Sequence, residues 1–128
     1  MKDKFLKRYQ TSQINCFATC FANLLFLNEN ELNKLPNHNK EGWDKEFKKY
    51  IRKYFNVDII MIKTKDIDDL PESICIITGK SPYSTGIDHS VIGCKGKILF
   101  DVKPESQGIL GDFKEWEFCY IVPLYLHI

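Results

Sequence analysis

Large apolar residues in the first part of the chain recur at helical spacing. The run from Cys16 to Leu27 is apolar around most of a helix circumference, which predicts a central, buried helix. A short helical turn is expected within residues 29–35, before Pro36. An amphipathic helix that stops near Asn56 is predicted by a second set of apolar positions: Trp43, Phe47, Ile51, Tyr54 and Phe55.

From Val57 onward the pattern changes to short β-branched or aromatic runs separated by Pro, Gly and Asp. Helices first and strands afterwards predict an α+β fold, in which the two helices pack on a mostly antiparallel sheet of about five strands. The chain of 128 residues fits a single domain, 1–128. The strands are predicted over residues 57–62, 74–78, 90–93, 97–101 and 116–122, with loops over 79–86 and 104–111.

Composition narrows the classes of function. The 18 basic and 17 acidic residues are mixed along the chain and give a net charge of +1, so we expect neither a nucleic-acid nor a membrane partner. The apolar run that ends at Leu27 is too short to span a bilayer and is followed by no small-residue cleavage site. The five cysteines are odd in number and form no CxxC pair, which favours a reduced, cytoplasmic compartment.

Three residues could form an activated thiol nucleophile. Asn15 is a plausible N-cap, which would put Cys16 in the first turn of its helix, and a helix N-terminus lowers the pKa of a thiol from about 8.5. His89, on a predicted strand, could serve as base and then as acid toward the leaving group. Asp101, on the next strand, could hold the imidazole in the required tautomer.

The role of Asp101 depends on the register of the hairpin between these strands. A three-residue loop with Gly96 in the left-handed conformation would pair position 89 with position 101 and put both side chains on one face. A two-residue loop of Lys95 and Gly96 would instead put them on opposite faces. We expect the first arrangement, with the turn centred on Lys95.

An oxyanion would need hydrogen-bond donors near the thiol. Gln10, six residues before Cys16, could supply its side-chain amide, with the Cys16 backbone N–H as a second donor. Gln13, three residues before Cys16, is the alternative.

The order Gln10, Cys16, His89, Asp101, with the cysteine at the start of a long buried helix, resembles the papain-like cysteine peptidase superfamily. The loop 79–82 before His89 and the strand that ends at Asp101 look most like the compact bacterial and phage domains related to double-glycine leader peptidases. The resemblance implies a papain-like fold with Cys16 as nucleophile, His89 as base, Asp101 as orienting group and Gln10 as oxyanion donor.

Other interpretations of these residues remain open. Cys20, one helical turn after Cys16, is a rival nucleophile or a space-filling neighbour. A zinc site of Cys16, Cys20, His89 and Cys94 would lack a second pair of ligands close together in the sequence. We expect no metal and no cofactor. Apart from these interpretations, Cys75, Cys94 and Cys119 are expected in the core, and His38 and His127 at the surface. His89 could also be a hydrogen-bonded histidine of the core.

Three functions fit this pattern. The first is a thiol hydrolase that cleaves a peptide or isopeptide bond of a peptide or protein substrate through a thioester. The second is a deamidase or acyltransferase that uses the same triad. The third is a non-catalytic binding or inhibitor protein, of phage or mobile-element origin, on a peptidase-like fold.

Overall fold

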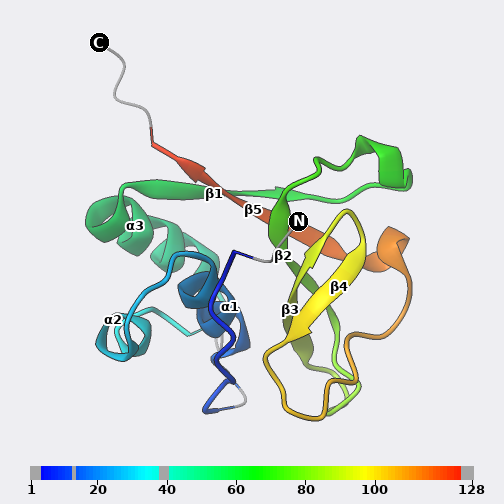
Figure 1. Cartoon of the computed structure of the whole chain (residues 1–128), viewed down its shortest axis with the longest axis horizontal. Coiled ribbons are helices and arrows are strands. Elements are labelled where there is room, and N and C mark those ends of the chain that lie inside the picture. The colour runs from blue at the N-terminus through cyan, green and yellow to red at the C-terminus, as the bar shows by residue number, and fades with distance from the viewer. Residues whose placement is uncertain (1–3, 13, 38–40, 125–128) are drawn as a thin grey trace.

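Three helices precede five strands along the chain in the computed structural model, which describes residues 4–12, 14–37 and 41–124 (Figure 1). The predicted α+β class, with a five-stranded antiparallel sheet, is confirmed. The helices are α1 (Cys16–Leu24), α2 (Glu29–Asn33) and α3 (Trp43–Phe55). The strands are β1 (Val57–Ile62), β2 (Ile74–Lys80), β3 (Asp88–Cys94), β4 (Lys97–Asp101) and β5 (Glu117–Pro123).

The sheet has the order β1-β5-β2-β3-β4, and every neighbouring pair is antiparallel. The last strand of the chain therefore lies between the first two. This insertion leaves the β3–β4 hairpin at one side of the sheet, away from β1 (Figure 1).

The first helix is buried because aromatic side chains of α3 cover it. The Phe47 ring meets Phe17 at 5.2 Å and Phe21 at 5.1 Å, both nearly edge to face. The same apolar cluster contains Ile76 of β2 and Ile92 of β3, so α1 is in contact with both α3 and the sheet. No helix within the described residues is long and apolar enough to cross a membrane.

The amphipathic helix ends where the sequence predicts. Asn56 is the C-cap of α3 in the left-handed conformation, with φ of 55°, and its N–H is bonded to the carbonyl of Ile51. The chain then enters β1 at Val57 without a loop. His38 and His127, which are expected at the surface, lie outside the described residues.

The turn between β3 and β4 differs from the prediction. Cys94 pairs with Lys97, so the turn has two residues, Lys95 and Gly96, with φ of 49° and 83°. Positive φ at both central positions is the pattern of a type I′ turn. The predicted pairing of position 89 with position 101 is therefore wrong, because Val91 is the partner of Asp101.

A bulge in β4 compensates for the shorter turn. Ile92 pairs with Phe100 and Gly93 pairs with Ile98, so Leu99 is an extra residue on β4. Because side chains alternate between the faces of a strand, the extra residue turns the side chain of Asp101 to the face of His89. The structure thus reaches the expected same-face arrangement through a different register.

Gly93 permits the close approach of the two strands at this bulge. A Cβ atom at this position would lie 2.5 Å from the Lys97 carbonyl oxygen and also meet the Ile77 side chain. A backbone oxygen in that place cannot move aside without breaking the hairpin. The position therefore requires glycine.

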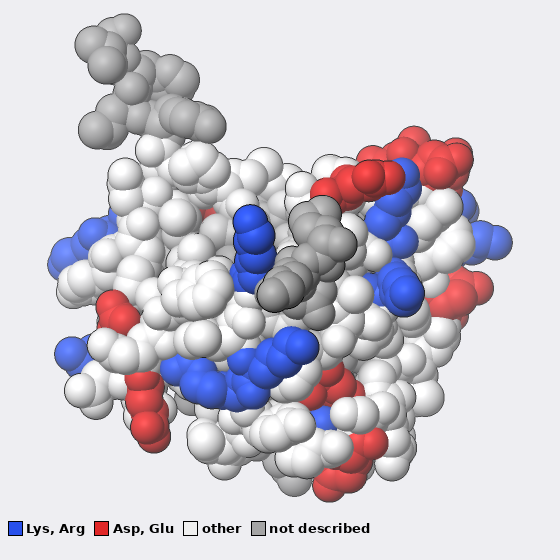
Figure 2. Space-filling view, viewed as in Figure 1, with Lys and Arg blue, Asp and Glu red and all other residues white. Residues whose placement is uncertain are grey.

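Acidic and basic side chains are interspersed on the face of the molecule in view (Figure 2). Two of the basic residues of α3, Arg52 and Lys48, form ion pairs with Asp58 of β1.

Candidate functional site

Cys16 is the first residue of α1, and Asn15 occupies the N-cap position as the sequence predicts. The Asn15 side chain does not cap the helix. Its Oδ1 instead accepts hydrogen bonds from the backbone N–H groups of Thr11 and Ser12, at 3.3 and 3.1 Å. Asn15 thus ties the preceding loop to the start of the helix.

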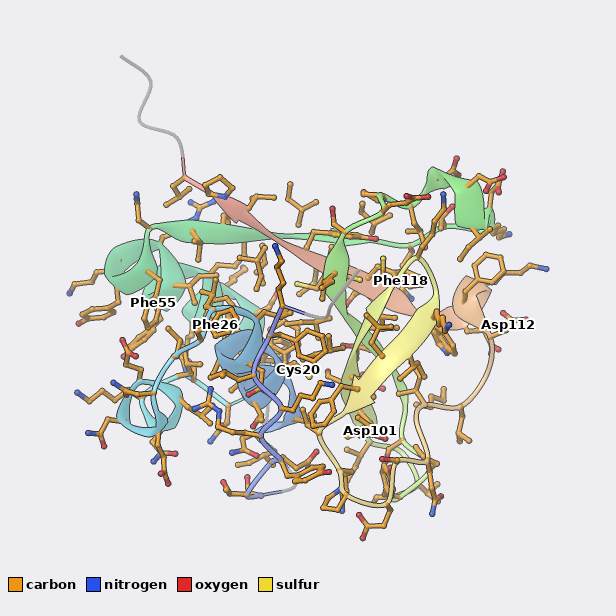
Figure 3. All side chains as sticks on the ribbon, in the orientation of Figure 1. Cys20, Phe26, Phe55, Asp101, Asp112 and Phe118 are labelled. Carbon is orange, nitrogen blue, oxygen red and sulfur yellow. The ribbon has the colours of Figure 1, made fainter. Side chains whose placement is uncertain are left out.

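The N-terminal segment connects this helix to the end of β4. The N–H of Leu6 donates to the Asn23 carbonyl in α1, and the N–H of Gln10 donates to the Val102 carbonyl at 2.8 Å. In Figure 3 the segment crosses in front of α1, which carries Cys20, toward the end of β4, which carries Asp101. Residues near the N-terminus and near position 101 therefore meet.

His89 lies at the start of β3, between Cys16 and Asp101. Its Nε2 lies 2.7 Å from Asp101 Oδ1, and its side chain also forms a hydrogen bond with Cys16. All three residues are buried, with Cys16 exposing 1% of its surface, His89 3% and Asp101 5%. Since Asp101 engages Nε2, Nδ1 is the ring nitrogen left to exchange a proton with the thiol.

The carboxylate of Asp101 has four hydrogen-bond donors. Oδ1 accepts from the Lys103 N–H at 2.8 Å in addition to His89. Oδ2 accepts from the Tyr83 hydroxyl and from the Gly108 N–H, both at 2.8 Å. A buried carboxylate with this set of donors is held in one orientation and in its charged form.

The pKa values of His89 and Asp101 are shifted in opposite directions. Burial raises the pKa of Asp101, but the hydrogen bonds from His89, the two backbone N–H groups and Tyr83 outweigh it and hold that pKa below its usual value. Burial likewise lowers the pKa of His89, whereas the hydrogen bonds to Asp101 and Cys16 and the charges of both raise it to about 9. An imidazolium beside a carboxylate is thus the favoured state of the pair at neutral pH.

Gln10 reaches the same site. Its side chain lines a small cavity of about 40 Å³ together with His89 and Tyr83. One N–H of the Gln10 amide donates to the Ser12 carbonyl at 2.8 Å, and Oε1 is buried without a donor among the described residues. An amide has two N–H donors, so one of them has no partner among the described residues. Gln13, the alternative donor, lies outside the described residues.

Tyr83 belongs to the site and was missed by the sequence analysis, which treated residues 79–86 only as a loop. Its ring stands edge-on to the His89 ring, with centroids 5.1 Å apart, and its hydroxyl bonds Asp101 Oδ2. The hydroxyl also accepts the Gln107 N–H at 2.7 Å, and burial raises the pKa of Tyr83 to about 12. Tyr83 therefore joins the loop before β3 to the loop after β4.

Replacing Tyr83 by phenylalanine is expected to lower the reactivity of Cys16 about tenfold. The ring stays against His89, but Asp101 loses one of four donors and Gln107 loses its acceptor, a cost of about 1–2 kcal/mol. The alkylation rate of Cys16, followed by mass spectrometry across pH 5–9, measures the effect. Tyr54→Phe, at an exposed residue on α3, is the matched control; an equal loss in both variants would contradict the role of Tyr83.

The other cysteines do not share these surroundings. Cys20 is fully buried below Cys16, and burial raises its pKa well above the usual value. Burial also raises the pKa of Cys75 to about 12 and that of Cys119 further. Cys20 is thus a neighbour that fills space, as one of the two interpretations held.

The four residues considered as zinc ligands do not lie together at one place. Cys94 is at the opposite end of β3 from His89. It is half-buried beside the β3–β4 turn, so the expectation that it lies in the core is wrong. Within the described part of the chain, no group of three or more His, Cys, Asp or Glu side chains is placed to hold a metal ion.

A larger groove, of about 440 Å³, lies beside the small cavity. Both are lined by Ile87 and Asp88, the two residues that precede His89. Phe17, which follows Cys16, also lines the groove. The nucleophile candidate and the base candidate are therefore flanked by residues of one groove.

No family model matches the chain. No curated protein matches it either, and neither does any solved structure. Cys16, His89, Asp101 and Tyr83 accordingly form one hydrogen-bonded site on an α+β fold, and Gln10 lines the small cavity beside His89 and Tyr83.

Proposed function

We propose that the chain is a cysteine peptidase-like thiol hydrolase that cleaves a peptide or isopeptide bond. The observation that carries the proposal is the buried His89 ring, bonded at Nε2 to Asp101 at 2.7 Å and bonded also to the Cys16 side chain. A thiol at a helix start, a base and an orienting carboxylate are the parts of an activated nucleophile. The resemblance to papain-like peptidases implies the same roles.

In the first half of the reaction, Cys16 Sγ attacks the substrate carbonyl carbon. The thiol proton resides on His89 Nδ1, so the attacking species is the thiolate of a thiolate–imidazolium pair. The carbonyl oxygen becomes an oxyanion, and in this proposal it accepts hydrogen bonds from the remaining Gln10 N–H and the Cys16 backbone N–H. When the intermediate collapses, the C–N bond breaks and His89 gives its proton to the leaving amine, which leaves a thioester on Cys16.

In the second half, water takes the place of the amine. Neutral His89 removes a proton from the water as it attacks the thioester carbonyl. The C–S bond breaks, a carboxylic acid leaves, and the proton returns to the Cys16–His89 pair. Throughout, Asp101 keeps Nε2 protonated and Nδ1 directed at the reacting atoms.

The substitution Gln10→Ala is expected to lower kcat by about 10²–10³ with little change in KM, because the amide N–H binds the oxyanion more strongly than the ground-state carbonyl. Steady-state cleavage of a fluorogenic peptide measures this. Gln10→Glu, of equal size, should show a loss at least as large since a carboxylate repels the oxyanion. An unchanged kcat in both variants would exclude Gln10 from the oxyanion site.

The proposal is tested by trapping the thioester. The protein is incubated with a diverse peptide mixture in the presence and absence of hydroxylamine, and the products are identified by mass spectrometry. Cleavage that requires Cys16, with peptide hydroxamates formed when hydroxylamine is present, is the expected result. Cys16→Ala is the control for background hydrolysis.

Other outcomes distinguish the alternatives. Conversion of Gln or Asn side chains, or transfer to an added amine without hydrolysis, would favour the deamidase or acyltransferase. No cleavage and no hydroxamate, in a protein whose Cys16 also fails to alkylate selectively, would favour the binding protein.

A further inference from the structure

The groove of about 440 Å³ beside the triad has an apolar wall. Trp43, Phe17 and Met61 line it from α3, α1 and β1, and Ile14 and Ile87 line it from the loops before Cys16 and before His89. Met61 and Ile14 each expose 36% of their surface and Ile87 exposes 41%, which is high for side chains of this size. Two of these side chains pack on each other: the Phe17 and Trp43 rings meet edge to face, with their centroids 5.1 Å apart.

The groove also has polar lining residues. Thr78 and Ser90 are paired across β2 and β3, and their hydroxyls are 2.8 Å apart. Glu117 of β5 is the register partner of Thr78 on the other side, and Asp88 is two residues before Ser90. The lining of one groove therefore combines two hydroxyl residues and two carboxylate residues with five apolar residues.

The two carboxylates carry no compensating cation in the groove. Among the described residues, neither Glu117 nor Asp88 forms an ion pair within 4.0 Å, although Lys80 is the register partner of Asp88. No lysine or arginine lines the groove. A half-buried Glu117 beside apolar residues attracts a cation more strongly than a carboxylate in open water does.

We propose that this groove is the substrate's side-chain subsite and that it selects lysine or arginine near the bond to be cleaved. The assignment as a substrate subsite rests on the proposed function, whereas the preference for a cationic side chain rests on the groove alone. Lysine and arginine combine an aliphatic stem with a charged end, which matches a groove lined by both apolar residues and carboxylates. The Trp43 ring adds a surface on which a cation can lie.

Binding is measured in the Cys16→Ala protein, so the readout does not depend on catalysis. The probes are the Nα-acetyl methylamides of arginine, lysine and norleucine, titrated while the NMR signals of the Trp43 indole and the Met61 methyl are followed. Saturable shifts are expected with arginine and lysine at concentrations at least fivefold lower than with norleucine. Norleucine has the stem without the charge and isolates the contribution of the carboxylates.

Variants identify the carboxylate responsible. Glu117→Gln is expected to remove the fivefold advantage of arginine and lysine and to leave norleucine binding unchanged. Glu72→Gln, at a residue that exposes 81% of its side chain, is the matched control and should change nothing. Equal binding of all three probes, or shifts confined to other residues, would overturn the proposal.

Failure of the subsite and failure of the proposed function are separable. If the protein cleaves peptides without a preference for lysine or arginine, the subsite is wrong and the hydrolase stands. If the cationic probes bind as expected but no thioester forms, the groove is a binding site for cationic side chains and the hydrolase is wrong.

Discussion

In the His89→Ala protein, Cys16 is expected to lose its preferential alkylation. In the unmodified protein at pH 6, iodoacetamide should label Cys16 on the order of 10²-fold faster than the other four cysteines, because the imidazolium stabilises the thiolate. Removing the ring leaves an ordinary buried thiol, and peptide cleavage should fall by at least about 10³-fold. Peptide mapping by mass spectrometry measures each cysteine separately.

Cys20 provides the control for this experiment. It is buried on the same helix, has no imidazole partner among the described contacts, and burial raises its pKa. Cys20→Ala should leave the labelling rate of Cys16 unchanged. Slow labelling of all cysteines, with the same pattern after His89→Ala, would show that no activated thiol exists.

Loss of Asp101 is expected to affect both stability and activity. In Asp101→Ala, the His89 ring, the Tyr83 hydroxyl and the backbone N–H groups of Lys103 and Gly108 lose a shared acceptor inside the protein. Breaking a buried pair of this kind costs about 3–5 kcal/mol, which urea unfolding measures. Activity should fall on the order of 10⁴-fold because the imidazole loses its tautomer and orientation.

The substitution Asp101→Asn removes the charge of this side chain and keeps its shape. The amide can still accept from two of the donors, so its loss of stability should be smaller than that of Asp101→Ala, while its loss of activity should be similar. Equal stability of all three proteins would contradict the buried hydrogen-bond network.

The pH dependence of stability gives a further check on the same pair. The pKa of His89 is raised in the folded protein, from 6.5 to about 9, so the pair's contribution is fully present below pH 6.5 and is lost as the pH rises through the folded value. The pKa of Asp101 is lowered, so its contribution is present above the usual value of 3.8 and is lost as the pH falls. The window of full stabilisation is therefore about pH 4–6.5.

This measurement belongs in the Cys16→Ala background. In the unmodified protein a thiolate at Cys16 would release a proton on folding and cancel the proton that His89 takes up. With Cys16 removed, the free energy of unfolding should decline above pH 6.5, and adding Asp101→Asn should flatten the decline. A profile that rises over this range would contradict the His89–Asp101 pair.

The periodicity of apolar residues was sufficient to predict the elements themselves. The bounds of α3 and β1 follow from local chemistry, since Asn56 tolerates the left-handed conformation and Val57 begins a β-branched run. Helix α1 was predicted as central because no face of it is polar enough for water. These properties depend on neighbouring residues along the chain, which a sequence displays directly.

The register of the β3–β4 hairpin could not be settled in the same way. Lysine at the first position of a type I′ turn is a weak signal, and the bulge at Leu99 has none. The turn and the bulge each shift the side chains by one residue, so two unpredicted features together gave the predicted face for Asp101.

The site likewise has some residues that the sequence identifies and some features that only the structure reveals. Residue types and their order identified Cys16, His89, Asp101 and Gln10 as candidates from the sequence alone. The tertiary structure alone decided that the Val102 carbonyl holds Gln10 in place, that Asn15 ties the loop rather than the helix, and that Tyr83 completes the shell of Asp101. The physical reason is that local sequence governs backbone conformation and amphipathic faces, whereas hydrogen bonds between distant loops form only after the sheet and helices have packed.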